Sequence, residues 1–291
     1  MNIIRTISLI IKHPGNKGGK FSALSRFIRW QIASRLAMGA IAVPFIDNTL
    51  LLVANGMTGA TGNIYNGLLE WEEMSFVLHF LRADELFVDV GANVGAYTVM
   101  AAGAVGSRCV CIEPIKSTFL HLRRNIAINF LEDHVDLHNV GAGAENGSIG
   151  FIEDADTRNR VAVQGESFVA VQVNTLDDIL GSRTPVLIKI DVEGFEPSVL
   201  AGAGRTLRSE SVQAVIVEVN GQEQRYGFAA NTVRDTLVAN GFTRIRYEPR
   251  TREIQRDVSS ADGNAIFVRS IALAQRKVAS SPQYQTLIGR L

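Results

Sequence analysis

The sequence predicts an α/β protein whose largely parallel sheet is covered by helices on both faces, and three observations support this prediction. Strand-like and helix-like segments alternate along residues 86–269, as they do in βαβ units. Most strand-like runs are apolar almost throughout, which is typical of parallel strands buried on both faces. Residues 86–95 (LFVDVGANVG) combine a buried strand with a glycine-containing turn, and a helix is expected to begin near Tyr97. Such a unit typically forms the seat of a nucleotide-like cofactor.

The elements of this core follow in a regular order. Beyond the opening strand, apolar runs predict strands at residues 108–113, 134–140, 185–191, 213–219, 242–247 and 264–269. Residues 116–129 are expected to form a helix between the second and third strands. Thr175 predicts the start of a short helix, because its hydroxyl can cap the amides of the first turn. Pro197 suits a first helical turn, and Gly241 ends the helix predicted to begin at Thr232.

The chain divides into three parts. Residues 65–270 are expected to form the core, with an inserted β segment near 149–173, where apolar and polar residues alternate as in an antiparallel hairpin. Residues 1–64 are a basic, partly helical amino-terminal extension, and residues 271–291 are a basic carboxyl-terminal tail. With 291 residues, of which 46% are hydrophobic and 20% charged, the chain can form one large domain with appendages.

The amino-terminal extension is distinguished by its charge. Residues 1–46 contain seven Lys or Arg residues and no acid, although the formal net charge of the chain is zero. Residues 21–38 predict an amphipathic helix with Arg26 and Arg29 on its polar side. Its expected apolar side holds Leu24, Phe27, Ile28, Ile32 and Leu36. Two interpretations stay open. In the first, the helix binds an anionic membrane or a phosphate-bearing substrate. In the second, it packs on the core and its basic face is only solvated.

Several features bear on the compartment. Cys109 and Cys111 are the only cysteines, and their i, i+2 spacing on a strand points both side chains to one face, where disulfide geometry is poor. This favours a reducing compartment. The apolar residues 6–11 form too short a run for a signal peptide, and no apolar run reaches the roughly 18 residues of a transmembrane helix. We therefore expect a cytoplasmic protein, with peripheral membrane contact through the basic extension as the open alternative.

Acidic residues end most of the predicted strands, at the edge where doubly wound sheets bind ligands. The residues at these ends are Asp89, Glu113, Ala142, Asp191, Glu193, Glu218 and Asn220. Glu113 follows Asp89 by 24 positions, where a carboxylate can accept both hydroxyls of an adenosine ribose. The turn at 91–95 lacks the G-x-G-x-x-G pattern that binds a pyrophosphate. An acid-rich rim therefore favours S-adenosylmethionine, with its sulfonium and ammonium groups, over NAD(P).

The same residues resemble one family. Five segments resemble the successive motifs of FkbM-type S-adenosylmethionine-dependent methyltransferases. They are FVDVGANVGAYT (87–98), EP (113–114), residues 122–125, TLDD (175–178) and LIKIDVEGFE (187–196). The resemblance covers about residues 65–270 and leaves the first 60 or so residues unassigned. It implies the class I methyltransferase fold, a Rossmann-like sheet of seven strands with the last one antiparallel, and methylation of a hydroxyl oxygen on natural products or sugars.

The resemblance also implies roles for the matching residues. Around S-adenosylmethionine it places Asp89, Gly91, Asn93 and Gly95 at the methionine part, Glu113 at the ribose and Ala142 or its neighbours at the adenine edge. For Asp89 the alternative is a structural role in the turn. Asn125, from the third motif, is expected to brace its own helix rather than bind a ligand.

Catalysis requires a group that accepts the proton of the acceptor hydroxyl. Lys189, Asp191 and Glu193 alternate along a predicted strand and therefore share one face at its carboxyl end. Asp191 is the first candidate for the base or for positioning the acceptor, close to the cofactor, and Glu193 is the second. The alternative is a structural Lys189–Asp191 ion pair, with Glu193 shaping the following turn.

The same residues also bear on other functions. Asp191, Glu218 and Asn220 offer oxygen ligands that Mg²⁺ accepts, but they match metal-dependent methyltransferases only in outline, so no metal is expected. The five histidines show no ligand spacing. The expected partner is a sugar, a glycolipid or another small molecule, and not a nucleic acid. An NAD(P)-dependent oxidoreductase and a noncatalytic Rossmann-like binding module stay open as alternatives.

Overall fold

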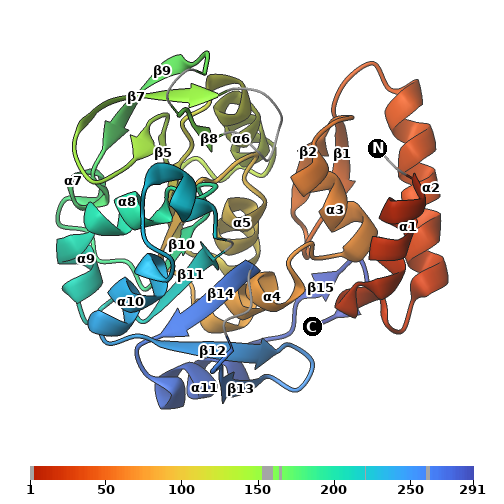
Figure 1. Ribbon diagram of the computed structural model, residues 1–291. Coiled ribbons are helices and arrows are strands. Elements are labelled where there is room, and N and C mark those ends of the chain that lie inside the picture. The colour runs from red at the N-terminus through yellow and green to blue at the C-terminus, as the bar shows by residue number, and fades with distance from the viewer. Residues whose placement is uncertain (1–2, 153–159, 164–165, 220, 260–262) are drawn as a thin grey trace.

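The computed structural model describes residues 3–152, 160–163, 166–219, 221–259 and 263–291. Its centre is an eight-stranded sheet with helices on both faces (Figure 1). In spatial order the strands are β13, β12, β14, β11, β10, β3, β4 and β5. Their bounds are β3 (Leu86–Val90), β4 (Arg108–Ile112), β5 (Val135–His138), β10 (Leu187–Ile190), β11 (Ala214–Val219), β12 (Thr243–Glu248), β13 (Glu253–Arg256) and β14 (Gly263–Val268).

The sheet is mostly parallel, as predicted. Strands β5, β4, β3, β10 and β11 pair with their neighbours in parallel register. The last strand of this sheet in chain order, β14, is antiparallel to both β11 and β12. The predicted count of seven strands is wrong, because β13 folds back antiparallel on β12 and adds an eighth strand at the edge. Most side chains of β13 are exposed, so no apolar pattern marks this strand in the sequence.

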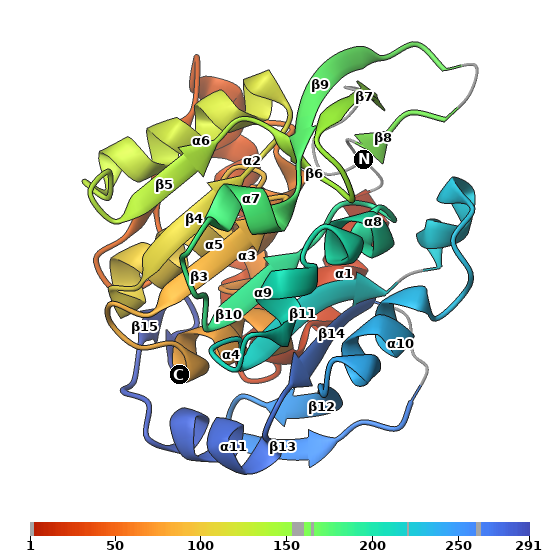
Figure 2. The same cartoon turned by 90° about the vertical axis from the view of Figure 1, so that its left-hand side faces the viewer.

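Alternate side chains of the strands enter two hydrophobic clusters on opposite faces of the sheet, so that Phe87 joins one cluster and Val88 the other. The first face is covered by α4 (Trp71–Phe80), α5 (Ala96–Val99), α6 (Lys116–Ile128) and α11 (Ile271–Ala279). The second face is covered by α7 (Leu176–Leu180), α8 (Glu196–Ala201), α9 (Gly204–Arg208) and α10 (Thr232–Ala239) (Figure 2). Cys109 and Cys111 both face the first cluster as free thiols.

A second, four-stranded sheet lies over the carboxyl ends of the central strands. Its strands, in the order β6, β9, β7, β8, are β6 (Gly141–Ala142), β7 (Gly147–Ile152), β8 (Arg160–Val161) and β9 (Val169–Asn174). The strands β7 and β9 pair antiparallel, which confirms the hairpin that the alternating pattern predicts. Within this segment, residues 153–159 and 164–165 lie outside the described residues.

The amino-terminal residues form a unit beside the core (Figure 1). It comprises α1 (Ile3–Lys12), α2 (Lys20–Leu36), the hairpin of β1 (Ile41–Pro44) and β2 (Leu50–Val53), and α3 (Thr58–Asn66). Asn125 on α6 joins this unit to the core. Its Oδ1 accepts a hydrogen bond from the amide of Leu52 at 2.6 Å, and its Nδ2 donates to the carbonyl of Val94 at 2.8 Å. Asn125 therefore links β2 to the glycine-containing turn instead of bracing only its own helix.

The end of the chain returns to the same unit. The short strands β15 (Gln285–Thr286) and β16 (Gly289–Arg290) pair antiparallel. Asp47 donates its amide to the carbonyl of Gln285 at 2.8 Å, and the Gln285 amide donates to the Asp47 carboxylate at 2.8 Å. Residues 281–291 thus bind the amino-terminal unit to the core from the opposite end of the sequence.

The helix α2 differs from its predicted orientation. Phe27 is buried as expected, together with Ala23 and Trp30, but Ile28 and Ile32 are exposed. The predicted apolar side is therefore partly wrong. Because apolar residues occur around most of this helix, the periodicity alone could not select the buried side. Within the described part of the chain, no helix has both the length and the apolar character needed to cross a bilayer.

Candidate active site

A cavity of about 440 Å³ lies at the carboxyl ends of β3, β4, β10 and β11, where the strand order reverses between β3 and β10. Ligands of open α/β sheets bind at such a reversal, and the volume is typical of pockets for small organic molecules. Of the predicted site residues, those that line the cavity are Gly91, Asn93, Glu113, Ala142, Asp191, Glu193 and Glu218. Asp89 and Gly95 are not among its lining residues, and Asn220 lies outside the described residues.

The turn at residues 91–95 has a backbone that requires its glycines. Gly91 and Gly95 have φ angles of 76° and 90°, and Asn93 between them has a φ of 50°, which Asn tolerates better than most residues. A Cβ at position 91 would lie 1.9 Å from the main-chain oxygen of Asp191. A Cβ at position 95 would lie 2.4 Å from Cδ1 of Leu122 on α6. The two glycines therefore let the turn approach both the end of β10 and α6.

Glu113 projects from the end of β4 into the cavity and is only 5% exposed. Its Oε2 accepts a hydrogen bond from the amide of Asn93 at 2.9 Å, and its Oε1 accepts one from the amide of Ile115 at 2.9 Å. Burial raises the pKa of Glu113 to about 7, although both amide donors lower it. Because each carboxylate oxygen can accept a second hydrogen bond, Glu113 can hold the turn and also bind hydroxyl groups in the cavity.

Lys189 lies between two predicted site residues. It is the register partner of Asp89 on β3, and its Nζ donates a hydrogen bond to Oδ2 of Asp191 at 2.9 Å. The Lys189 side chain is 5% exposed and that of Asp191 is 29% exposed. Burial lowers the pKa of Lys189, but the charges of Asp191 and Asp89 outweigh burial and leave the pKa raised. The ion pair considered from the sequence is therefore present, and Asp191 also lines the cavity.

Asp89 lies behind the cavity wall. It is 1% exposed, and its Oδ2 accepts a hydrogen bond from the hydroxyl of Thr98 on α5 at 2.8 Å. Burial raises the pKa of Asp89, while the charge of Lys189 lowers it. The observed bond connects β3 to the helix that follows it. A contact between Asp89 and the cofactor stays a prediction.

The turn after β10 is shaped by Glu196. Its Oε1 accepts hydrogen bonds from the amides of Val192 at 3.0 Å and Gly194 at 3.1 Å. Burial raises the pKa of Glu196 to about 7. Glu193, in the same turn, has a φ of 56°, and Gly194 has a φ of 98°. The carboxyl group of Glu196 thus stabilises a turn with two consecutive positive φ angles. Glu193 in this turn lines the cavity.

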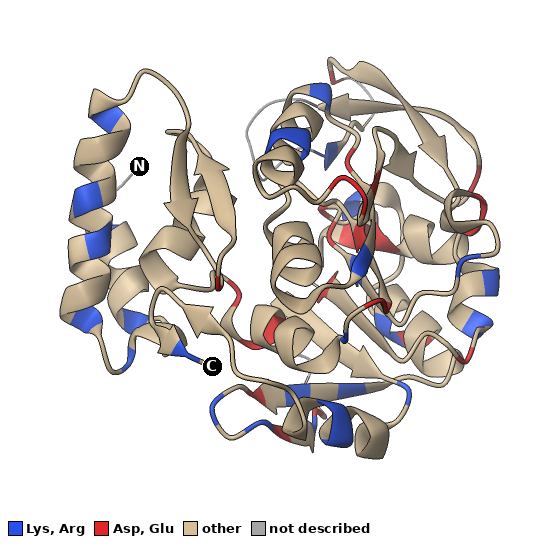
Figure 3. Cartoon of the chain, turned by 180° about the vertical axis from the view of Figure 1, so that it is seen from behind, with Lys and Arg blue, Asp and Glu red and all other residues tan. Residues whose placement is uncertain are grey.

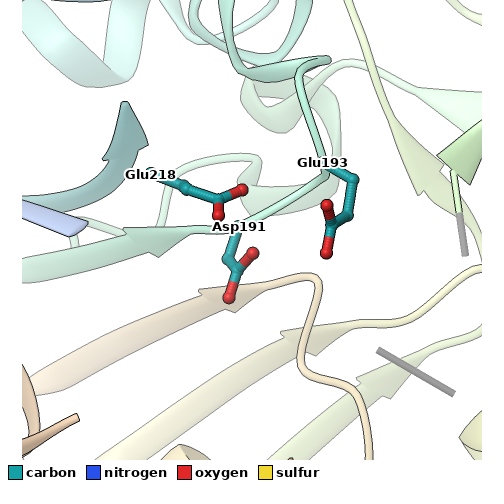
Figure 4. A group of neighbouring side chains, drawn as sticks. All are labelled: Asp191, Glu193 and Glu218. Carbon is teal, nitrogen blue, oxygen red and sulfur yellow. The ribbon is translucent and has the colours of Figure 1, made fainter. Parts of the chain in front are cut away.

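Three carboxylates converge at this edge of the sheet. Asp191, Glu193 and Glu218 each have an oxygen within 4.8 Å of the others (Figure 4). Glu218 comes from β11, whereas Asp191 and Glu193 follow β10. Gln222 donates a hydrogen bond to Oε2 of Glu193 at 3.2 Å. The candidate metal ligands from the sequence were Asp191, Glu218 and Asn220. In the structure, the third member of the group with Asp191 and Glu218 is Glu193. Carboxylates this close together favour a cation, whether it is a metal ion or an organic cation.

One wall of the cavity was not predicted from the sequence. It comes from the amino-terminal unit and the start of α4, through Thr58, Gly59, Asn63, Leu69, Glu70 and Met74. The hydroxyl of Tyr97 donates a hydrogen bond to Oε2 of Glu70. The ammonium of Lys189 lies 4.8 Å from the centre of the Tyr97 ring. Glu70 is one of three acids at residues 70–73 and lies outside the family motifs, so only the fold shows that it reaches the cavity.

The fold and the site together define the class of protein. The strand order, with β14 inserted antiparallel between β11 and β12, is that of the Rossmann-like class I methyltransferases, here with β13 added at the edge. A glycine-containing turn after β3 and an acid at the end of β4 occupy the ligand-binding edge of that fold.

Comparison with known families identifies the chain further. A sequence profile of the methyltransferase FkbM domain matches residues 89–244, more than half of the 291 residues. The chain therefore belongs to the FkbM methyltransferase family, as the motifs predicted. A search of curated proteins finds no significant match.

Solved structures with a similar fold include several methyltransferases. The overlap with a methyltransferase from Pyrococcus furiosus covers 85% of this chain and 98% of that one, with 15% identity and a TM-score of 0.39. An rRNA methylase from Streptococcus thermophilus gives 67% and 93% coverage, 11% identity and a TM-score of 0.40. For a precorrin-6y C5,15-methyltransferase from Geobacter metallireducens GS-15, the coverages are 69% and 87%, the identity 14% and the TM-score 0.39. The class assignment rests on the strand order and the family match.

Proposed function

We propose that this chain is an S-adenosylmethionine-dependent O-methyltransferase that acts on a hydroxyl of a sugar, a glycolipid or a small natural product. The observation that carries this proposal is the charge of the cavity. Among the described residues that line it, Lys189 is the one cation, against the carboxylates of Glu70, Glu113, Asp191, Glu193 and Glu218. This surrounding attracts the sulfonium and ammonium groups of S-adenosylmethionine and repels the pyrophosphate of NAD(P).

The residues around the glycine-containing turn fit this cofactor. Glu113 is fixed by two backbone amides and keeps the capacity to accept the ribose hydroxyls. Ala142 on β6 is buried beside the cavity, where a small side chain leaves room for a flat adenine ring. Gly91 and Asn93 line the cavity next to the cluster of carboxylates, and so offer a place for the methionine part.

The acceptor then lies between the cofactor and the wall that the amino-terminal unit provides. Glu70 on this wall offers a carboxylate, which is a group that hydrogen-bonds sugar and other polyol hydroxyls. The wall residues precede residue 89, where the match to the family profile begins. The wall therefore supports an acceptor specificity particular to this chain.

Catalysis needs little more than alignment and the removal of one proton. When bound, S-adenosylmethionine supplies a methyl carbon activated by a sulfonium leaving group. Alignment of the acceptor oxygen with that carbon accounts for most of the acceleration. The proton of the acceptor hydroxyl passes to Asp191, whose side chain is oriented by Lys189 at 2.9 Å, and Glu193 is the second candidate.

Calorimetric titration with S-adenosylmethionine, S-adenosylhomocysteine and NAD in turn tests the cofactor. We expect both adenosyl ligands to bind with micromolar affinity and NAD not to bind. Binding of NAD alone would favour the oxidoreductase alternative, and a folded protein that binds none of the three would favour a noncatalytic module. Transfer of a labelled methyl group to hydroxyl-bearing acceptors, with amine analogues as controls, then tests the O-directed reaction.

A further inference from the structure

The helix α2 presents a second apolar side to solvent. Phe21, Ile28, Ile32 and Leu36 recur at spacings of seven, four and four residues, so they lie on one side of the helix. Their exposed fractions are 91%, 56%, 57% and 79%. The opposite side, with Phe27 and Trp30, is already buried against the protein. Apolar surface that is contiguous and exposed marks an interaction site more often than an isolated apolar residue does.

Basic residues border this apolar side. Arg29 and Arg35 are exposed on α2 and lie on either side of the row of apolar residues. The neighbouring helix α1 adds the exposed Leu9 and the exposed Lys12. Figure 3 shows Lys and Arg along α2, and the sequences of α1 and α2 contain no acidic residue. On the exposed side of α2 the apolar residues are thus central and the basic residues marginal, and α1 adds one exposed residue of each kind.

We propose that this surface, the exposed side of α2 with the adjoining end of α1, docks on an anionic lipid bilayer. An interfacial helix combines an apolar face that enters the acyl boundary with basic residues that contact lipid phosphates, and this surface has both. A second copy of the chain fits less well. Self-association through the same surface would bring Arg29 and Arg35 of one copy against the same residues of the other, without an acid to pair with them.

The docked orientation has a consequence for the cavity. Arg26 on the inner side of α2 donates hydrogen bonds to the carbonyls of Ile64 at 3.0 Å and Tyr65 at 2.7 Å, both on α3. The rings of Phe27 and Tyr65 pack edge to face, with their centres 5.2 Å apart. The same α3 contributes Thr58, Gly59 and Asn63 to the cavity wall. The unit that contacts the bilayer is thus the one that forms the acceptor wall.

If the proposed function holds, this arrangement favours an acceptor that is itself held in the membrane, such as a glycolipid. That consequence rests on the proposed methyl transfer. The docking on the bilayer does not depend on methyl transfer, because it requires neither the cofactor nor the acceptor. Failure of the docking proposal can therefore be distinguished from failure of the proposed function.

The test is co-sedimentation of the full chain with vesicles, without cofactor or acceptor. We expect binding to vesicles of phosphatidylglycerol and phosphatidylcholine in equal parts, and weak or no binding to pure phosphatidylcholine. The double substitution Ile28→Ser with Ile32→Ser should weaken binding by about tenfold or more, because it removes apolar area from the contact. Arg29→Gln with Arg35→Gln should weaken it to a similar extent and reduce its salt dependence.

The matched control is Val238→Ser. Val238 lies on α10 and is 54% exposed, close to the value for Ile28, but α10 covers the other face of the core. Its substitution should leave vesicle binding unchanged, and circular dichroism should show all variants folded. Equal binding to neutral vesicles would overturn the assignment to anionic lipid. A stable dimer that the isoleucine substitutions dissociate, with no vesicle binding, would assign the surface to a second copy of the chain instead.

Discussion

The main chains of Gly91 and Asp191 approach so closely that a Cβ at position 91 would lie 1.9 Å from the Asp191 carbonyl oxygen. These residues belong to the two longest family motifs, which are 100 positions apart in the sequence and adjacent in the sheet. The contact therefore couples the glycine-containing turn to the carboxylate that we propose as the base.

Gly91→Ala should destabilise the protein by about 3 kcal/mol or more, because the new Cβ meets backbone that cannot move aside and also occupies a positive φ. Gly227→Ala is the matched control. Gly227 has a φ of 80°, but apart from its two chain neighbours no described residue has an atom within 4 Å of a Cβ there. It should cost only about 1 kcal/mol. Thermal unfolding of both variants measures the difference, and equal losses would contradict the steric role of Gly91.

The affinity for S-adenosylmethionine should rise as the pH increases through about 7. Burial raises the pKa of Glu113 to about 7, and the ionised carboxylate is the form that accepts both ribose hydroxyls. Below that pH the carboxyl is protonated, so if Glu113 binds the ribose as proposed, affinity should fall by about tenfold for each pH unit. Titration calorimetry between pH 6 and 8 measures this. Glu113→Gln should bind weakly at every pH, and an unchanged pH dependence in this variant would assign the effect to another group.

Asp191→Asn should lower kcat by about 100-fold or more, since it removes the proposed proton acceptor. Glu193→Gln should lower kcat less. If Asp191 only binds the cofactor, its substitution will raise KM for S-adenosylmethionine and leave kcat intact at saturation. The pH profile of kcat distinguishes these outcomes, because a lost base removes the acidic limb of the profile.

Glu70→Gln should raise KM for the acceptor by about tenfold, because this carboxylate belongs to the proposed acceptor wall of the cavity. Tyr97→Phe should have a similar but smaller effect, since it removes the hydroxyl that hydrogen-bonds Glu70 and keeps the ring beside Lys189. The affinity for S-adenosylmethionine should stay unchanged in both variants. A matching loss of cofactor affinity would move Glu70 to the cofactor site.

Methyl transfer should be insensitive to a chelator such as EDTA. Asp191, Glu193 and Glu218 lie close enough to share a cation, but Lys189 already places an ammonium 2.9 Å from Asp191. A positive charge held in the protein reduces the benefit of a second one at the same carboxylate. Activity that is lost with EDTA and restored by Mg²⁺ would show that the three acids bind a metal after all.

Much of the fold was predictable from local patterns. The apolar strands and capped helices alternate visibly, and this alternation determines a parallel sheet covered on both faces. The edge strand β13 was missed because its exposed residues leave no apolar pattern. The helix α2 was predicted, but its buried side was predicted only in part, because both of its sides carry large apolar residues.

The sequence by itself determined the family, the glycine-containing turn and most acids at the strand ends, because these depend on motifs and on strand order. The tertiary structure decided what those residues touch. It buried Asp89 against Thr98, paired Lys189 with Asp191 and brought Glu70 to the cavity from outside the motifs. The physical reason is that burial, pairing and pKa depend on neighbours supplied by distant segments, and local sequence carries no record of them.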